Sequence, residues 1–434
     1  MADELRISIE KLVYGGDGLA HADGNTVFVP YVLPGEEVRA AAKSKRKKLV
    51  WAQLLEVTAA SAQREGARCP HFQTCGGCHY QHILAAEQLR LKKEILRETL
   101  SRLGGIQWSG VIQEHSAQPY GYRNRAQWAV RDANPRAIGY FLPESSVIVP
   151  IDECPVLSPL LAKTFGQLQE LARSNRLPEK ALEIEAFADS ADANVALNVA
   201  FERFPRAAAE LAGAFREALP QLESLLLADE SKDRFELSGP GYLFQEAGGF
   251  RYRVSHLSFF QVNRFLIEDL LQSVVGSAKG EAALDLYAGV GFFTLPLTRA
   301  FKRVVSVDAN LAATRDLHVN AESAGVAVIS HNEHVEEFLR KTSEKPDFVV
   351  LDPPRSGLGA EAAAKLAELG AAEIVYLSCD PSTLARDLAV LTGSKKSGDA
   401  ASAPTRYEIA DMHLFDLFPQ TYHIETLVRL RRAP

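Results

Sequence analysis

The chain has 434 residues, of which 47% are hydrophobic and 24% charged, enough apolar material for roughly two to four domains of about 100 to 200 residues each. No stretch of about 18 consecutive apolar residues occurs, and charged and apolar residues alternate closely at the N-terminus, so we expect neither a membrane span nor a signal peptide, and a cytoplasmic location. A formal net charge of −7 excludes a uniformly basic surface, so any contact with nucleic acid must depend on local positive charge.

Residues 5 to 60 alternate short apolar segments with glycine-containing turns. This spacing predicts about five strands in a small closed β-barrel. The segment "KSKRKK" places five positive charges in six residues. It is either a solvated hairpin tip or a contact to nucleic-acid phosphates. The charged residues are Lys43, Lys45, Arg46, Lys47 and Lys48.

Four of the five cysteines form one pattern, C-x5-C-x2-C followed by a distant fourth. An odd number of cysteines in a reducing compartment argues against a disulfide framework. Four thiolates can bind either tetrahedral zinc or an iron–sulfur cluster. Structural zinc sites usually have two closely spaced pairs, and only one such pair occurs here, so the spacing favours the cluster. The expected ligands are Cys69, Cys75, Cys78 and Cys154.

The middle of the chain offers fewer motifs. Apolar residues at helical spacing from Ile83 to Leu103, followed by two glycines, predict one long amphipathic helix. Residues 110 to 250 read as mixed strands and helices, and residues 392 to 405 have the composition of a surface loop.

After Ser255 the pattern becomes a regular alternation of apolar strands and amphipathic helices. Such alternation predicts a parallel sheet with helices on both faces. The last two strands, separated by a short proline-containing turn, are expected to pair antiparallel at the edge of this sheet.

The segment "LDLYAGVGFFTL" follows the first of these strands, where an open parallel sheet binds its ligands. Gly289 and Gly291 allow the backbone to approach a ligand, whereas position 294, the third glycine of a dinucleotide loop, is threonine. Asp308 ends the next strand, where an acid meets ribose hydroxyls. The pattern favours S-adenosylmethionine over NAD, and "LDPPRSGL" with Asp352 narrows the class to methyltransferases acting on a planar base or an amide.

Cys379 ends the fifth strand, in "LSCDPSTLARDL". A helix is expected to begin at Pro381, and its N-terminus would lower the pKa of the thiol. A lone cysteine is usually a small buried hydrophobe. For a pyrimidine substrate, however, thiolate addition at carbon 6 makes carbon 5 nucleophilic, and a base must then remove the proton from carbon 5. Glu425 in "HIETLVRL" is the candidate base, and an acid on a solvent-facing strand surface is the alternative.

Together with "FFQVN" at 259 to 263, these motifs resemble the RNA (uracil-5-)methyltransferase family, in the family's order and over almost the whole chain. The resemblance implies Cys379 as nucleophile, Glu425 as base and Phe259 near the uracil. It also implies S-adenosylmethionine-binding positions, which with the two loop glycines are Gln261, Tyr287, Gly289, Gly291, Asp308, His334 and Asp352. The chain departs from the family at Phe292, often Asn, and at His334, often Asn or Asp.

Residues 5 to 60 resemble a TRAM domain, which implies that the charged hairpin contacts RNA. Within the family the cysteine pattern holds a [4Fe-4S] cluster, and members with both features most often modify ribosomal RNA. The expected fold is α/β: a TRAM barrel at residues 1–60, a central iron–sulfur α+β domain at 61–254 and a Rossmann-like methyltransferase domain at 255–434. We expect a monomer that methylates a uridine in 23S ribosomal RNA. The alternatives are a tRNA uridine enzyme, a cytosine-5 methyltransferase and a non-catalytic iron–sulfur RNA-binding protein.

Overall fold

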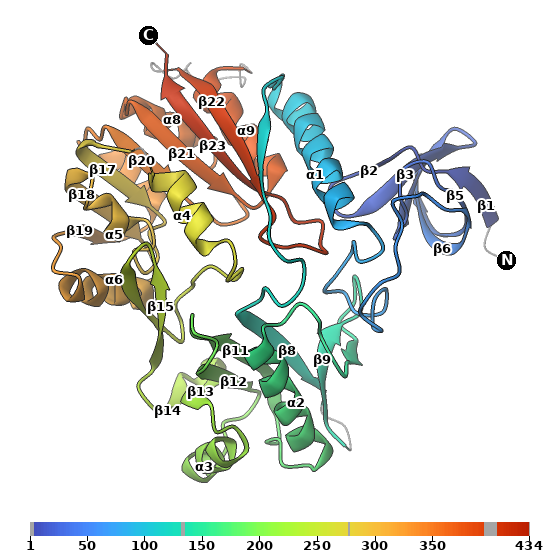
Figure 1. Cartoon of the computed structure of the whole chain (residues 1–434), viewed down its shortest axis with the longest axis horizontal. Helices are drawn as coiled ribbons and strands as arrows, with labels where there is room; N and C mark the ends of the chain where they lie inside the picture. The colour runs from blue at the N-terminus through green and yellow to red at the C-terminus, as the bar shows by residue number, and fades with distance from the viewer. Residues whose placement is uncertain (1–3, 132–134, 277, 395–405, 434) are drawn as a thin grey trace. The chain divides into compact units, whose positions relative to one another are not determined.

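The computed structural model describes residues 4–131, 135–276, 278–394 and 406–433 (Figure 1). The chain forms two compact units: unit 1 comprises Met1–Glu98, Tyr140–Ile151 and Phe418–His423, and unit 2 comprises the remaining three segments, Thr99–Gly139, Asp152–Leu417 and Ile424–Pro434. Most of the loop predicted at 392 to 405 lies outside the described residues. Among the residues described, no helix has both the length and the apolar character needed to span a membrane.

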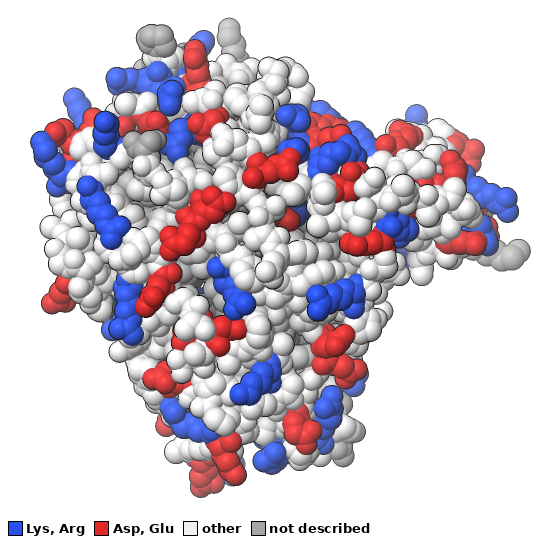
Figure 2. Space-filling view, viewed as in Figure 1, with Lys and Arg blue, Asp and Glu red and all other residues white. Residues whose placement is uncertain are grey.

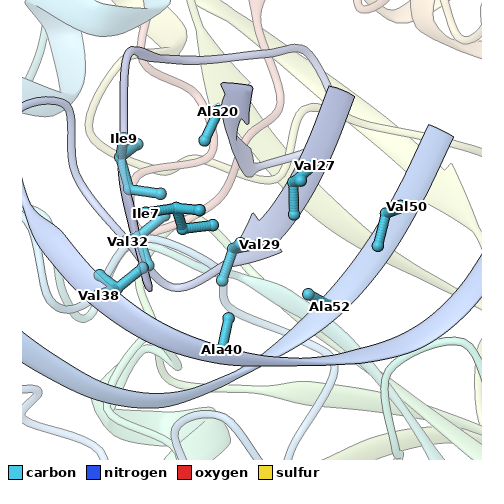
Figure 3. Close-up of a cluster of buried hydrophobic side chains, with 10 residues drawn as sticks. All are labelled: Ile7, Ile9, Ala20, Val27, Val29, Val32, Val38, Ala40, Val50 and Ala52. Carbon is cyan, nitrogen blue, oxygen red and sulfur yellow. The ribbon is translucent and has the colours of Figure 1, made fainter. Parts of the chain in front are cut away.

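Unit 1 begins with a sheet of six strands in the order β1-β5-β6-β4-β3-β2. Figure 3 shows its core, where small and β-branched side chains such as Ile7, Val29 and Val38 converge from successive strands. A Cβ atom at Gly18 would lie 2.3 Å from a methyl group of Val32, so this close approach requires glycine. The strand that exceeds the predicted five is the two-residue β2. The strands are β1 (Glu4–Ser8), β2 (Lys11–Leu12), β3 (Asp17–Ala22), β4 (Asn25–Pro30), β5 (Glu37–Arg46) and β6 (Leu49–Ala59).

The predicted long helix is confirmed as α1 (Ala85–Thr99), which continues into a π-helical turn, η1 (Leu100–Gly104), and ends at Gly105 with φ of 69°. The Gln88 side chain joins α1 to the segment Phe418–His423 of the same unit. Its amide donates to the side-chain oxygen of Gln420 at 3.1 Å, and its oxygen accepts from the backbone N–H of Gln420 at 3.0 Å. The short strand β10 (Ile148–Pro150) also belongs to unit 1.

Unit 2 contains most of a mixed sheet of seven strands in the order β10-β9-β8-β11-β12-β13-β14. Helices α2 (Pro159–Arg173) and α3 (Ala208–Ala218) pack against it, and the Trp128 and Phe165 rings stack with centroids 4.9 Å apart. The hairpin of β15 (Tyr242–Ala247) and β16 (Phe250–Ser255) follows. Besides β10, the sheet consists of β8 (Arg125–Arg131), β9 (Ala137–Phe141), β11 (Ala181–Ala188), β12 (Val195–Phe201), β13 (Leu222–Asp229) and β14 (Arg234–Ser238), with the 3-10 turn η2 (Glu230–Lys232) between the last two.

The second sheet of unit 2 has eight strands in the order β19-β18-β17-β20-β21-β23-β22-β7, flanked by helices (Figure 1). The predicted parallel arrangement is confirmed for β17 to β21. The strands are β7 (Ile112–His115), β17 (Gly280–Leu286), β18 (Phe301–Asp308), β19 (Ile329–Asn332), β20 (Phe348–Leu351), β21 (Glu373–Ser378), β22 (Tyr407–Phe415) and β23 (Glu425–Arg432). The helices are α4 (Ile267–Val275), α5 (Thr294–Leu297), α6 (Leu311–Ser323), α7 (Val335–Lys341), α8 (Ala360–Glu368) and α9 (Pro381–Thr392).

The last two strands pair antiparallel as predicted, but their expected place at the sheet edge is wrong. The strand β7, from far earlier in the chain, pairs parallel with β22 and lies outside it. Its His115 stacks on Phe415 with ring centroids 4.0 Å apart and bonds His413 at 2.8 Å. A four-residue strand carries too little periodicity to be recognised in the sequence.

Candidate active site

Four neighbouring strands bring the predicted motifs to one edge of the second sheet. Leu286 at the end of β17 is paired with Val307 of β18 and with Leu351 of β20, and Leu351 is paired with Tyr376 of β21. Paired residues lie at the same level along a sheet. The residues that follow them, including Tyr287, Asp308 and Asp352, therefore emerge together at the carboxyl edge.

The glycine loop after β17 closes onto the end of β18. The Asp308 carboxylate accepts the backbone N–H of Gly289 at 2.8 Å and that of Asn310 at 2.7 Å. Tyr287, Gly289 and Gly291 all have positive φ, at 61°, 54° and 92°. This left-handed backbone suits the two glycines and is strained for tyrosine.

Thr294, at the position where a dinucleotide loop has its third glycine, has a role that the sequence did not reveal. Its hydroxyl donates to the Asp285 carboxylate at 2.5 Å. Burial raises the pKa of Asp285 to about 7, and Asp308 and Asp352 contribute to the increase. A buried, hydrogen-bonded carboxyl group therefore lies just before the glycine loop.

The two departures from the family pattern lie in different settings. Phe292 is buried and packs edge-on against Phe260, with centroids 5.3 Å apart, so its side chain belongs to the core. His334 is exposed immediately before α7. The Tyr287 hydroxyl reaches the same helix by donating to Glu336 at 2.9 Å.

The "FFQVN" segment is fixed by a buried acid that sequence reasoning missed, Asp316 of α6. Its carboxylate accepts the Ser255 N–H and hydroxyl and the Ser258 hydroxyl, each at 2.7 Å. Beyond this anchor, the Gln261 amide donates to Asp352 at 3.5 Å, and the Phe259 side chain is 58% exposed. The segment therefore presents an aromatic ring to solvent while it contacts the acid after β20.

A second missed acid, Asp387 of α9, holds the "LDPPRSGL" loop. It is fully buried. It accepts the backbone N–H of Leu358 at 2.8 Å and of Gly359 at 3.2 Å, and the Tyr376 hydroxyl at 2.7 Å. The loop that begins at Asp352 is therefore tied to the helix that begins after Cys379.

Cys379 and Glu425 lie on adjacent antiparallel strands. Ser378 of β21 is paired with Thr426 of β23, so Cys379 and Glu425 are the next residues along the two strands in the direction of the carboxyl edge. Cys379 is partly buried and Glu425 almost entirely so. The strand register therefore places the two groups next to each other, and the charge of Glu425 adds to the rise in the pKa of the thiol that burial causes.

The predicted lowering of the Cys379 pKa is wrong. Burial, with smaller contributions from Glu425 and Asp352, raises the pKa of the thiol to about 12. Helix α9 begins at Pro381 as predicted, but Asp380 caps it and accepts the N–H groups of Ser382 at 2.8 Å and Thr383 at 3.0 Å. The helix N-terminus is therefore already compensated by a carboxylate.

The pKa values of the neighbouring carboxyl groups are raised as well. Burial raises the pKa of Asp352 to about 6, and the hydrogen bond from Gln261 opposes this increase. Burial, together with Asp352, raises the pKa of Glu425 well above its usual value, and Arg355 opposes it. The site thus concentrates acidic groups in a partly dehydrated space, which favours a positively charged ligand.

The cysteine pattern is divided between the two units. Cys69, Cys75 and Cys78 lie in a segment of turns in unit 1, and Cys154 lies in unit 2. Burial raises the pKa of Cys75 to about 11, and Cys78 and Cys69 add to the increase. Within the described part of the chain, no three His, Cys, Asp or Glu side chains are placed to hold a metal ion.

The charged segment "KSKRKK" lies where the sequence predicted, at the tip of the β5–β6 hairpin. All five of its cationic side chains are exposed, and Lys47 turns the chain with φ of 56°. Nothing in the barrel core depends on these side chains.

Comparison with known proteins identifies two regions of the chain. The family profile described as "tRNA (Uracil-5-)-methyltransferase" matches residues 85–433, and the TRAM domain profile matches residues 3–55. Two proteins named "23S rRNA (uracil(1939)-C(5))-methyltransferase RlmD" are similar over nearly their whole length. The one from Alkalilimnicola ehrlichii is 32% identical, with 99% of this chain and 97% of that protein covered. The one from Pseudomonas entomophila is 34% identical, with 97% and 92% covered.

Among solved structures, the Pyrococcus abyssi tRNA (uracil-54, C5)-methyltransferase in complex with S-adenosyl-L-homocysteine superposes with a TM-score of 0.76. It is 25% identical to this chain, and the match covers 98% of this chain and 100% of that one. With a profile match over four-fifths of its length and relatives above 30% identity over almost all of it, the chain belongs to the tRNA (uracil-5-)-methyltransferase family.

Proposed function

We propose that this protein transfers a methyl group from S-adenosylmethionine to carbon 5 of a uridine in 23S ribosomal RNA, as a cytoplasmic monomer. The observation that carries the proposal is the juxtaposition of Cys379 and Glu425 at the carboxyl edge of the sheet, beside Asp352. The names of the full-length relatives support ribosomal RNA. The solved tRNA enzyme, with lower identity, makes tRNA the second candidate.

The site has the composition that a charged nucleoside donor requires. Asp308 ends β18, where ribose hydroxyls are held in this class of sheet, and the two loop glycines leave room for the ligand. Gln261, Tyr287, His334 and Asp352 are assigned to the same ligand. When bound, S-adenosylmethionine supplies an electrophilic methyl group on a positively charged sulfur, and the acids of the site match that charge.

In the proposed reaction, the Cys379 sulfur forms a bond to carbon 6 of the uracil, and the electron pair of the 5,6 double bond moves toward carbon 5 and the 4-oxygen. Carbon 5 then takes the methyl group and carries both that group and its hydrogen. Glu425 removes the proton from carbon 5, the 5,6 double bond re-forms and the sulfur leaves. A raised pKa makes Glu425 a stronger base than an ordinary carboxylate.

The thiol must lose its proton before it attacks. A positive charge bound beside Asp352 and Glu425 would lower the pKa values of all three acidic groups, because it stabilises their anionic forms. The site is therefore arranged so that the thiolate forms preferentially once the charged donor is present.

The uridine must leave its stack for carbon 6 to meet the sulfur. The exposed ring of Phe259 is placed to replace the lost stacking. The hairpin-tip cations Lys43, Lys45, Arg46, Lys47 and Lys48 are assigned to RNA phosphates, where they add affinity with little sequence preference.

The four cysteines Cys69, Cys75, Cys78 and Cys154 are proposed as ligands of a [4Fe-4S] cluster, on the support of their spacing in the sequence. The proposed methyl transfer has no redox step, so the role is structural. Anaerobically purified protein should contain about four iron and four sulfide ions per chain and absorb near 400 nm. Cys154→Ser should lose both signals and Cys379→Ser should keep them. Stoichiometric zinc instead of iron would refute the cluster.

The function is tested by incubating the anaerobically purified protein with S-adenosylmethionine and either unmodified 23S ribosomal RNA or bulk tRNA, followed by nuclease digestion and mass spectrometry. We expect 5-methyluridine in ribosomal RNA with the wild type and none with Cys379→Ala. Methyl in tRNA alone would overturn the substrate assignment and keep the chemistry. No methyl in either RNA, from protein that binds the donor, would refute the enzymatic proposal.

A further inference from the structure

A pocket of about 530 Å³ lies on the mixed sheet of unit 2, and the one residue that it shares with the proposed uracil-binding site is Phe259. Its floor is formed by side chains of β8, β11, β12, β13 and β14, and its wall by residues 256–259 together with Val262 and Asn310. The volume falls within the range of small-ligand sites, about 300 to 1,000 Å³.

The strand registers explain why one face of this sheet is chemically distinct. Glu183 of β11 is paired with Ala200 of β12, Ala200 with Ala228 of β13, and Ala228 with Phe235 of β14. Because paired residues point to the same side, a carboxylate, two alanines and a phenylalanine form one row across the sheet. The small alanines leave the space between Glu183 and Phe235 open.

Two aromatic rings line this pocket. Phe235 is 49% exposed on the edge strand, and Phe259 is 58% exposed. Exposed aromatic rings on an open sheet face are how RNA-binding sheets stack unpaired bases, at about 1 to 3 kcal/mol per base. Phe235 therefore offers a ring on which a base can stack.

The charges in the pocket favour a base over a phosphate. Arg123 and Arg125 are balanced by Glu183 and Glu185, so the pocket lacks the positive excess that a phosphate channel has. Over the face of the molecule that Figure 2 shows, Lys and Arg are interspersed with Asp and Glu. Glu185 is occupied, since it accepts from Arg125 at 2.6 Å and from Asn198 at 2.8 Å.

Glu183 differs from Glu185 because its partner is a neutral amide. Gln127 donates to one oxygen of the Glu183 carboxylate. A carboxylate has about four acceptor sites and no donor. Its remaining capacity matches an amino group on a base edge, as when a carboxylate accepts from the amino group of cytosine.

The pocket is mechanically joined to the methyl-transfer site. Arg125 donates to the backbone oxygen of Ser258 at 2.8 Å, and Asn310, next to the donor-binding segment, donates to that of Leu257 at 3.2 Å. Three residues further along, Gln261 contacts Asp352. A ligand in the pocket would therefore contact the segment that carries both Phe259 and Gln261.

We propose that this pocket binds an unstacked base of the substrate RNA that flanks the target uridine. Phe235 stacks the base, and Glu183 selects a base with an exocyclic amino group. This inference rests on the proposed function for the identity of the RNA and adds to it a second point at which the RNA sequence is recognised.

The stacking part is tested with an RNA fragment in which the wild-type protein forms 5-methyluridine or, if no methyl forms, with the fragment that it binds most tightly. Each flanking nucleotide is replaced in turn by an abasic one, and the Kd is measured. One abasic position should weaken binding to the wild type by about tenfold. Phe235→Ala should weaken binding to the intact RNA by a similar factor and show no further loss with that abasic RNA.

Leu182→Ala is the matched control, because Leu182 is 50% exposed on the same strand as Glu183 and lies outside the pocket. It should keep both the wild-type Kd and the sensitivity to the abasic position. The proposal is overturned if Phe235→Ala binds RNA like the wild type. It is also overturned if, at every position, the fold-losses in RNA affinity caused by Phe235→Ala and by the abasic nucleotide multiply, because the two changes then act independently. An unchanged RNA affinity would point to an occupant other than RNA.

The selectivity part uses Glu183→Ala, which removes the acceptor, and the base identified by the abasic scan. Replacing that base with an analogue that lacks the exocyclic amino group should raise the wild-type Kd by about fivefold or more. Glu183→Ala should bind both RNAs equally, and equal discrimination by the two proteins would refute the role of Glu183. Because both tests measure Kd, they remain decisive even if no 5-methyluridine forms, an outcome that would count against the proposed function alone.

Discussion

Asp387 provides the most direct test of how the fold holds the site, because its buried carboxylate holds the end of the loop that begins at Asp352, through the N–H groups of Leu358 and Gly359. We consider Asp387→Asn, which keeps the size of the side chain and replaces one acceptor oxygen with a donor. Oδ2 accepts from the Leu358 N–H and the Tyr376 hydroxyl, and Oδ1 accepts from the Gly359 N–H and from Arg386 at 2.8 Å.

The least costly arrangement places the new amide at the Oδ1 side. Arg386 is partly exposed there and can turn to water, but the Gly359 N–H loses its acceptor, at about 1 to 3 kcal/mol. The remaining hydrogen bonds change from charge-assisted to neutral, which costs about another 1 kcal/mol. The free energy of unfolding should therefore fall by about 2 to 4 kcal/mol, and binding of S-adenosylmethionine should weaken because Asp352 loses its support.

Urea unfolding followed by circular dichroism measures the first effect, and titration calorimetry measures the second. Tyr376→Phe removes a single hydroxyl from the same network and should cost about 1 kcal/mol. Glu368→Gln, which disrupts an exposed ion pair on α8, should change stability by less than about 0.5 kcal/mol. If Asp387→Asn unfolded at the wild-type urea concentration and bound the donor normally, the assigned role of Asp387 would be wrong.

The other predictions concern the reaction, the buried acids and the RNA contact. Glu425→Gln should slow turnover by about 10²- to 10⁴-fold and accumulate a covalent protein–RNA adduct on denaturing gels, which adding Cys379→Ala should abolish. Asp352 has a pKa raised from 3.8 to about 6, so its stabilising protonated form is complete below pH 4 and is lost as the pH rises through 6. Asp352→Asn, neutral at every pH, should therefore be more stable than the wild type by about 2 to 3 kcal/mol at pH 8 and equally stable near pH 3, as measured by urea unfolding; a difference independent of pH would contradict the assigned protonation. At the hairpin tip, alanine replaces Lys45, Lys47 and Lys48. These substitutions should weaken binding of all RNA sequences alike and reduce the salt dependence of log Kd by about 0.7 to 0.9 per charge. The control Lys302→Ala on β18 should change neither the affinity nor its salt dependence.

Elements with local signals could be predicted from the sequence alone. The alternation of strands and helices located β17, β18, β20 and β21, and right-handed crossovers between them require a parallel sheet. Motifs at the ends of those strands were bound to meet, since every strand of a parallel sheet ends at the same edge. The position of Asp308, Asp352 and Cys379 at one edge of the sheet was therefore predictable without coordinates.

Only the tertiary structure decided the features that depend on partners distant in the chain. In the sequence, Asp316 and Asp387 do not differ from other acidic residues of a helix. The structure shows that their carboxylates hold two loops of the site. Likewise β7 became the edge strand through its pairing with β22. The pKa of Cys379 shows the difference most clearly: the sequence predicted a lowered value from the adjacent helix, whereas burial and the carboxylate of Glu425 raise it. Dehydration and charge proximity are properties of the packed three-dimensional site, and no local sequence pattern specifies them.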